Sequence, residues 1–172
     1  DYTKPVFMQP KLDGVRCLIQ YDAGKVTAYS RTGKVWKNTE HIELNLLKFF
    51  NKYPNVILDG ELYNHDFKDD FESIISMVRK QKPTAEDKSI SRDNVQFHCY
   101  DIVNENQLFD IRCEFIARYV PESYCVCHVE TLQCFVESDA KIIHEQNLKD
   151  GYEGSIVPVS YTHLTLPTNH PV

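Results

Sequence analysis

Hydrophobic and polar residues alternate along several short segments of this chain, a pattern typical of strands with one buried face. Other segments repeat apolar residues every three or four positions, as amphipathic helices do. The alternating pattern predicts strands over residues 4–10, 15–21, 25–31, 55–63, 95–103 and 152–157. The helical pattern covers residues 39–53, 69–80, 110–120 and 138–151.

Local signals refine these elements. The "DAG" at residues 22–24 is typical of a hairpin turn. Helix starts are expected at Thr39, Asp110 and Ser138, and Gly151 is expected to end the last helix. Residues 82–94 are polar without a clear period, and we expect a loop there. Mixed helices and hairpin-linked strands predict an α+β fold with mainly antiparallel sheets and flanking helices.

Composition is that of a folded soluble domain. The 172 residues are 42% hydrophobic and 26% charged, long enough to bury one core. No apolar run approaches the roughly 20 residues that cross a bilayer, so we expect no membrane contact and a cytoplasmic location. A net charge of −6 argues against a general polyanion-binding protein, so any nucleic-acid contact must be local.

The six cysteines show no C-x-x-C spacing. "CVCH" at residues 125–128 could ligate a metal, but no second cluster completes four ligands, and an alternating strand explains it better. Free thiols are then expected, which favours a reducing compartment.

Charged residues beside glycine recur at strand ends. The motifs are "KLDGVR" (11–16), "SRTGK" (30–34), "LDGEL" (58–62) and "YEGSI" (152–156). A glycine at such a place lets the backbone approach a ligand closely. Among their residues are Lys11, two arginines (Arg16 and Arg31) and two glutamates (Glu61 and Glu153), a set that suits a polyphosphate and a divalent metal. No glycine-rich P-loop occurs, so a nucleotide would bind in another way.

These motifs, with "FHCYDIV" (97–103), follow the order found in covalent nucleotidyltransferases. The chain most resembles the adenylation domain of ATP-dependent DNA ligases of the small phage and viral type, from about Lys4 to Val157. The resemblance implies an ATP-grasp-like nucleotidyltransferase fold. It also implies that the protein acts in the cytoplasm of a bacterial or phage-infected cell. It also implies ATP and Mg²⁺ or Mn²⁺ as cofactors and nicked duplex DNA as partner. We expect a monomer.

By motif position, the resemblance assigns a role to each site residue. Lys11 would attack the α-phosphate of ATP and form a lysyl-AMP intermediate, from which AMP passes to the 5′-phosphate of a nick. Arg16 and Arg31 would bind the nucleotide and the nick phosphate. Glu61 would bind ribose or metal, and Glu153 the metal. Tyr100 would stack on adenine, and Gln9 would contact it.

Several alternatives stay open. An RNA ligase or a capping guanylyltransferase shares the lysine motif, and a fragment that binds nucleotide without chemistry is also compatible with it. Tyr100 could instead pack in the core. Asp13 and Asp59, each followed by glycine, are expected to hold turns.

The last residues depart from the family pattern. Residues 158–172 contain no lysine or arginine and resemble the translation of a transposon-end sequencing adapter. We therefore expect the adenylation domain to occupy residues 1–157 and residues 158–172 to be a non-native tail. The K-x-K motif and oligonucleotide-binding domain of the family would then be absent.

Overall fold

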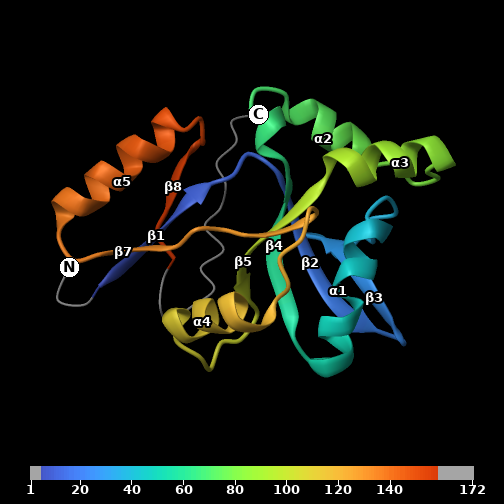
Figure 1. Ribbon diagram of the computed structural model, residues 1–172, viewed down its shortest axis with the longest axis horizontal. Coiled ribbons are helices and arrows are strands. Elements are labelled where there is room, and N and C mark those ends of the chain that lie inside the picture. The colour runs from blue at the N-terminus through green and yellow to red at the C-terminus, as the bar shows by residue number, and fades with distance from the viewer. Residues whose placement is uncertain (1–4, 159–172) are drawn as a thin grey trace.

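The computed structural model describes residues 5–158, which form two sheets (Figure 1). The larger sheet has five strands in the order β3-β2-β4-β5-β6. Its strands are β2 (Val15–Asp22), β3 (Lys25–Ser30), β4 (Ile57–Tyr63), β5 (Gln96–Ile102) and β6 (Val126–His128). Neighbouring strands run antiparallel except β5 and β6, which are parallel. Residues 159–172, including most of the expected tail, lie outside the described residues.

The smaller sheet is built around the first strand. Here β1 (Val6–Lys11) lies between β7 (Leu132–Cys134) and β8 (Gly154–Ile156), and both neighbours are antiparallel to it. Only three residues separate the end of β1 from the start of β2. The turn after Lys11 therefore carries the chain from one sheet to the other.

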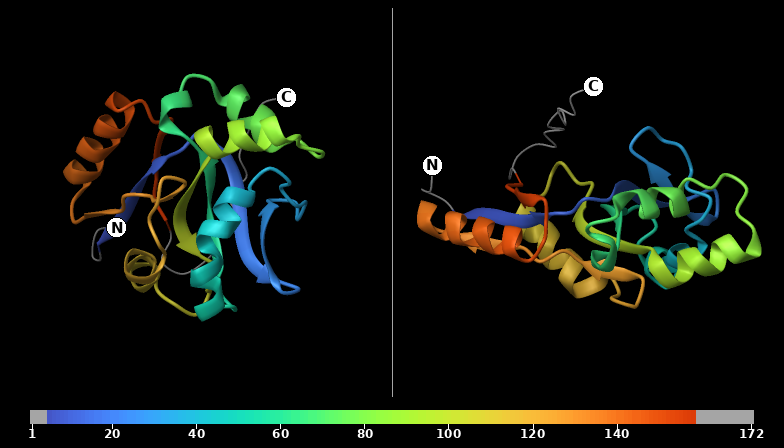
Figure 2. Two further views of the ribbon diagram at one scale, coloured as in Figure 1. Left: turned by 45° about the vertical axis from the view of Figure 1, so that its right-hand side comes forward. Right: turned by 90° about the horizontal axis from the view of Figure 1, so that it is seen from above.

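Helices surround the sheets. Their bounds are α1 (Glu40–Lys52), α2 (Phe71–Val78), α3 (Ala85–Asn94), α4 (Phe109–Tyr119) and α5 (Glu137–Lys149), with a 3₁₀ turn, η1 (His65–Phe67). Figure 2 shows α5 and the smaller sheet at one end of the molecule, and α1, α2 and α3 with the larger sheet at the other. Within the described residues, none of these helices is both long enough and apolar enough to cross a membrane.

The main core lies between one face of the larger sheet and α1. The apolar face of α1 is fully buried there, as its period predicts, through Ile42, Leu46 and Phe50. Cys17 and Phe97 reach the same core from β2 and β5. Side chains alternate along a strand, so the residues next to these core residues point to the opposite face of the sheet. That face carries the candidate site.

The α+β architecture with mainly antiparallel sheets is confirmed, whereas the loop expected at residues 82–94 is wrong. Residues 85–94 form α3, which starts with a reciprocal capping box between Thr84 and Asp87. Its Ser91 is buried and donates a hydrogen bond to the Asn38 carbonyl oxygen at 2.6 Å. Capping and polar contacts stabilise this helix, and neither produces a hydrophobic period.

The expected helix starts are only partly right. Thr39 occupies the N-cap of α1, although its side chain makes no capping hydrogen bond. Asp110 lies within the first turn of α4, and α5 begins before Ser138, with Val136 at the N-cap. Gly151 follows the end of α5, as predicted. All six cysteines are free thiols, and "CVCH" contributes β6, in agreement with the strand interpretation.

Candidate functional site

Lys11 stands where the two sheets meet. It pairs with Gly154 across β1 and β8, and its carbonyl oxygen accepts a hydrogen bond from the Glu153 amide at 3.1 Å. Its Nζ lies 2.7 Å from Glu153 Oε2, and both side chains are less than half exposed. The first and last motifs of the sequence, 142 positions apart, therefore form one ion pair that solvent can still reach.

The turn after Lys11 packs directly on β4. A Cβ atom added to Gly14 would lie 2.6 Å from Glu61 Cγ and 2.6 Å from the Leu62 carbonyl oxygen. Only glycine allows this approach without displacing β4. Asp13 lies in the same connection between β1 and β2, and its role in holding the turn stays a prediction.

One face of the larger sheet collects polar side chains from three strands. Arg16 on β2 lies opposite Glu61 on β4, and Glu61 lies opposite His98 on β5. Cross-strand partners project from the same face, so these three side chains form a row. The row lies on the face away from the core beneath α1.

Asp59 connects this row to Tyr100. The Arg16 guanidinium donates two hydrogen bonds to the Asp59 carboxylate, at 3.1 and 2.7 Å. The Tyr100 hydroxyl donates a third, at 3.2 Å. Asp59 is only 2% exposed, so the paired Arg16 compensates a buried charge. Burial, and then the neighbouring Asp59 charge, raise the pKa of Tyr100.

The expectation that Asp59 holds a turn is therefore wrong, because Asp59 lies inside β4. The Asp-Gly pair marks a different feature, a shift in the pairing register of β4 and β5 between Asp59 and Gly60. A side chain at Gly60 would overlap the Phe97 ring and the His98 carbonyl oxygen. Gly60 is required because β4 and β5 approach closely at this irregularity. Asp59 supplies the charge partner for Arg16.

Glu61 is held in surroundings that disfavour its charge. Burial raises its pKa to about 8, and the negative charges of Asp59, Asp13 and Glu153 act in the same direction. Arg16 opposes them. Such a concentration of carboxylates would be relieved by a bound cation.

The described residues contain no group of three metal-ligating side chains. A divalent ion would therefore find one or two carboxylates here, with its other ligands from water or substrate oxygens. Mg²⁺ commonly binds in this way, so Glu61 and Glu153 fit the ion that the sequence implies.

Gln9 contacts two residues in the wall of a cavity of about 310 Å³. Its side-chain nitrogen donates to the Tyr100 carbonyl oxygen at 3.0 Å and to Thr131 Oγ1 at 2.9 Å. Both acceptor residues line the cavity, together with Cys99, Cys113, Glu114, Ile116, Ala117, His128 and Val129. Because a carbonyl can only accept, the amide orientation of Gln9 is fixed, and its Oε1 is the acceptor that remains.

Arg31 lies apart from the other predicted residues. It follows β3, two strands from β4 in the larger sheet, and its side chain is exposed. The structure thus brings Lys11, Arg16, Glu61, Tyr100, Gln9 and Glu153 to one region and leaves Arg31 at the sheet edge.

Sequence reasoning missed His98 and Thr131. Burial, and then the charge of His65, lower the pKa of His98 to about 4, so it is neutral in the row beside Glu61. Its position two residues before Tyr100 was the available signal, since alternate residues of a strand share a face. Thr131 gave no comparable signal.

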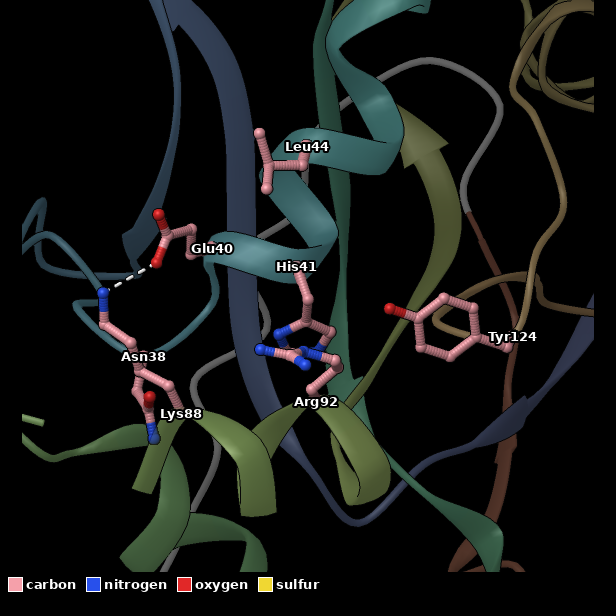
Figure 3. Close-up of a pocket in the computed structure, with 7 residues that line it drawn as sticks. All are labelled: Asn38, Glu40, His41, Leu44, Lys88, Arg92 and Tyr124. Carbon is pink, nitrogen blue, oxygen red and sulfur yellow. Dashed lines mark hydrogen bonds and ion pairs between the residues drawn. The ribbon is translucent and has the colours of Figure 1, made fainter. Parts of the chain in front are cut away.

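A second cavity, of about 300 Å³, lies where α1 meets α3 (Figure 3). Its lining includes the Glu40–Lys88 ion pair at 2.7 Å, together with His41, Arg92 and Tyr124. None of the predicted site residues lines it. We therefore place the candidate site at the junction of the two sheets.

Known proteins resemble this chain in sequence pattern and fold. The profile of the ATP-dependent DNA ligase domain matches residues 2–160. Among curated proteins, none matches the sequence significantly.

Solved structures share the fold at low sequence identity. The protein Pmar-Lig aligns with 94% of this chain at a TM-score of 0.73 and 20% identity. The ATP-dependent DNA ligase of bacteriophage T7, in complex with ATP, aligns with 90% at 0.68 and 19%. The Chlorella virus DNA ligase-adenylate aligns with 93% at 0.68 and 16%.

An archaeal ATP-dependent RNA ligase is also similar, at a TM-score of 0.62 and 17% identity over 92% of this chain. The aligned part spans 40% of Pmar-Lig and 57% of each of the two viral ligases.

Proposed function

Since this chain belongs to the ATP-dependent DNA ligase domain family, we propose that it catalyses adenylation of Lys11 as the first step of sealing nicks in duplex DNA. The observation that carries the proposal is the Lys11–Glu153 ion pair of 2.7 Å at the junction of the two sheets. Around it lie Arg16 and Glu61, which the register of β2 and β4 places side by side.

The reaction forms a bond between Lys11 Nζ and the α-phosphorus of ATP, and the bond to the pyrophosphate oxygen breaks. An ammonium has no lone pair for this attack, so Lys11 must first separate from Glu153 and lose a proton. Its 44% exposure allows water to take that proton. Mg²⁺ or Mn²⁺, when bound, supplies charge neutralisation at the phosphates, and Glu61 and Glu153 are the residues that would hold it.

Base recognition is assigned to the cavity beside Gln9 and Tyr100. Its volume of about 310 Å³ falls in the range of small-molecule pockets. Gln9 Oε1 is an acceptor, which suits the amino group of adenine better than the carbonyl of guanine. The Tyr100 ring would stack on the base while its hydroxyl stays on Asp59.

The later steps would use the same face. Asp59 orients Arg16 through Nε and Nη2, which leaves the outer N–H groups of the guanidinium directed toward a phosphate such as the one at a nick. Arg31, exposed at the sheet edge, would contact the DNA backbone. The AMP would pass to the 5′-phosphate, and the 3′-hydroxyl would then displace it. Such sealing would serve DNA repair, replication and recombination.

The test is transfer of label from ATP, radiolabelled at its α-phosphate, to the protein with Mg²⁺, read on a denaturing gel. The wild-type chain should acquire label and Lys11→Ala should not. Lys88→Ala is a matched control, because Lys88 is also 44% exposed and lies 2.7 Å from a glutamate. Label that persists in Lys11→Ala, or no label in the wild type, would refute the proposal.

An RNA ligase is the second candidate, favoured by the similarity to the archaeal enzyme. The discriminating measurement compares sealing of nicked DNA duplex with sealing of a nicked RNA duplex of the same sequence. Faster sealing of the RNA nick would assign the chain to RNA.

A further inference from the structure

The 3₁₀ turn η1 contacts the loop that leads into Glu153. His65 Nε2 donates to the Asp150 carbonyl oxygen at 3.0 Å. The His65 ring lies 4.6 Å, centre to centre, from the Tyr152 ring. The aliphatic stem of Lys68 covers Gly151 so closely that an added Cβ would lie 2.6 Å from Lys68 Cε. Three consecutive loop residues are thus contacted from one side by η1 and by Lys68, which follows it.

The loop is also fixed at both of its ends. Gly151, at φ +88°, and Tyr152 close the C-terminus of α5 through hydrogen bonds to the Leu148 and Asn147 carbonyls. This is a Schellman motif, which requires a left-handed residue and favours glycine. At the other end, the Glu153 amide donates to the Lys11 carbonyl oxygen. The contacts of η1 fall between these two anchors.

His65 is itself oriented by β4. The Tyr63 hydroxyl lies 2.8 Å from His65 Nδ1, and Tyr63 is 2% exposed. Because Nε2 faces a carbonyl, it must carry the hydrogen, and in the neutral ring Nδ1 then accepts from the tyrosine hydroxyl. Tyr63 stands two residues after Glu61 on the same strand. One polar chain therefore links the strand of Glu61 to the loop of Glu153.

We propose that His65 is a positioning residue, which holds the loop Asp150–Tyr152 against β4 and so directs Glu153 toward Lys11. The consequence for adenylation rests on the proposed function, but the mechanical role of His65 does not. His65 touches none of the groups placed at the reacting phosphate, so it would act only through the loop.

The mechanical role is tested by amide hydrogen exchange on the full chain. His65→Ala should speed exchange at Tyr152 and Glu153 by about 3- to 10-fold, the equivalent of one hydrogen bond. His65→Gln, which can still donate to Asp150, should restore part of the protection. Unchanged exchange in His65→Ala would overturn the proposal.

His41→Ala is the matched control. His41 Nε2 also contacts a backbone carbonyl, that of Val95 at 2.9 Å, but His41 lies on α1 away from the loop. Its loss should leave exchange at Tyr152 and Glu153 unchanged. An equal rise in both variants would indicate general loosening and would also overturn the proposal.

The catalytic consequence is read from the rate of Lys11 labelling as ATP concentration varies. His65→Ala should lower the maximal rate and leave the half-saturating ATP concentration nearly unchanged, because Gln9 and Tyr100 are untouched. A loss confined to ATP affinity would refute positioning of Glu153. If the wild-type chain acquires no label, the proposed function fails, and hydrogen exchange alone decides the role of His65.

Discussion

Glu61→Gln should stabilise the folded chain at neutral and alkaline pH, although it removes a candidate functional carboxylate. Glu61 is partly buried against the turn at Gly14, and three further carboxylates raise its pKa together with burial. Glutamine keeps the shape and the contact with Gly14 but carries no charge. The substitution therefore isolates the electrostatic cost of placing an acid there.

The magnitude follows from the pKa of Glu61, which rises from 4.5 to about 8 on folding. At about 1.4 kcal/mol per pKa unit, the cost of ionising Glu61 in the folded state is about 3–5 kcal/mol. The sign of the change in stability with pH follows because the pKa of this acid is higher in the folded state than in the unfolded state. Below pH 4.5 both states are protonated and nothing is lost. Between pH 4.5 and 8 the unfolded chain releases the proton first, so stability falls as pH rises.

The assay is urea unfolding of wild type and Glu61→Gln at several pH values from 4 to 8, without divalent metal. The two proteins should differ little near pH 4, and the variant should gain stability progressively above it. Glu40→Gln is the control of opposite sign, because Lys88 lowers the pKa of Glu40. A difference that does not change with pH, or a variant less stable than wild type at pH 8, would refute the reasoning.

Two further predictions concern residues that the structure ties to named contacts. Tyr100→Phe should cost about 1 kcal/mol of stability, because it removes one hydrogen bond to Asp59, while ATP affinity changes little since the stacking ring remains. Urea unfolding measures the stability and ATP titration measures the affinity. A large loss of ATP affinity would contradict stacking. Gly151→Ala should cost about 1–2 kcal/mol, because φ of +88° disfavours an L-residue and Lys68 occupies the added Cβ position. An unchanged melting temperature would contradict that account.

Periodicity predicted the elements whose burial is one-sided. The α1 helix and strands β2 and β5 bury one face more fully than the other, so their sequence patterns predicted their structure, whereas β4 is buried on both faces. The α3 helix buries only Ser91 and is stabilised by its capping box, so its sequence has no hydrophobic period from which it could be predicted. The predicted starts of α4 and α5 were imprecise for a related reason. Their N-cap residues, Leu108 and Val136, make no side-chain hydrogen bond that a sequence motif could reveal.

The site depended on contacts that no local pattern contains. An Asp-Gly pair favours a turn when its neighbours in sequence are the only information. The role of Asp59 depends on Arg16, 43 positions away on a neighbouring strand. His65 likewise became informative only through Asp150, 85 positions along the chain. Motif order could identify the residues that meet, but not the side chains that hold them in place.

The carboxylates of this site account both for the stability that ionised Glu61 costs the fold and for the proposed chemistry. Asp59 is neutralised by Arg16, and Glu153 is neutralised by Lys11, so each of these carboxylates has its own cation. Glu61 has only the influence of Arg16, which is already bound to Asp59, and it therefore favours the protonated form. Bringing a polyphosphate to Lys11 would separate the Lys11–Glu153 pair and leave two carboxylates without a partner. Under the proposed function, a divalent cation that accompanies the nucleotide would meet both, and the fold would then retain a partly buried acid that weakens it in isolation.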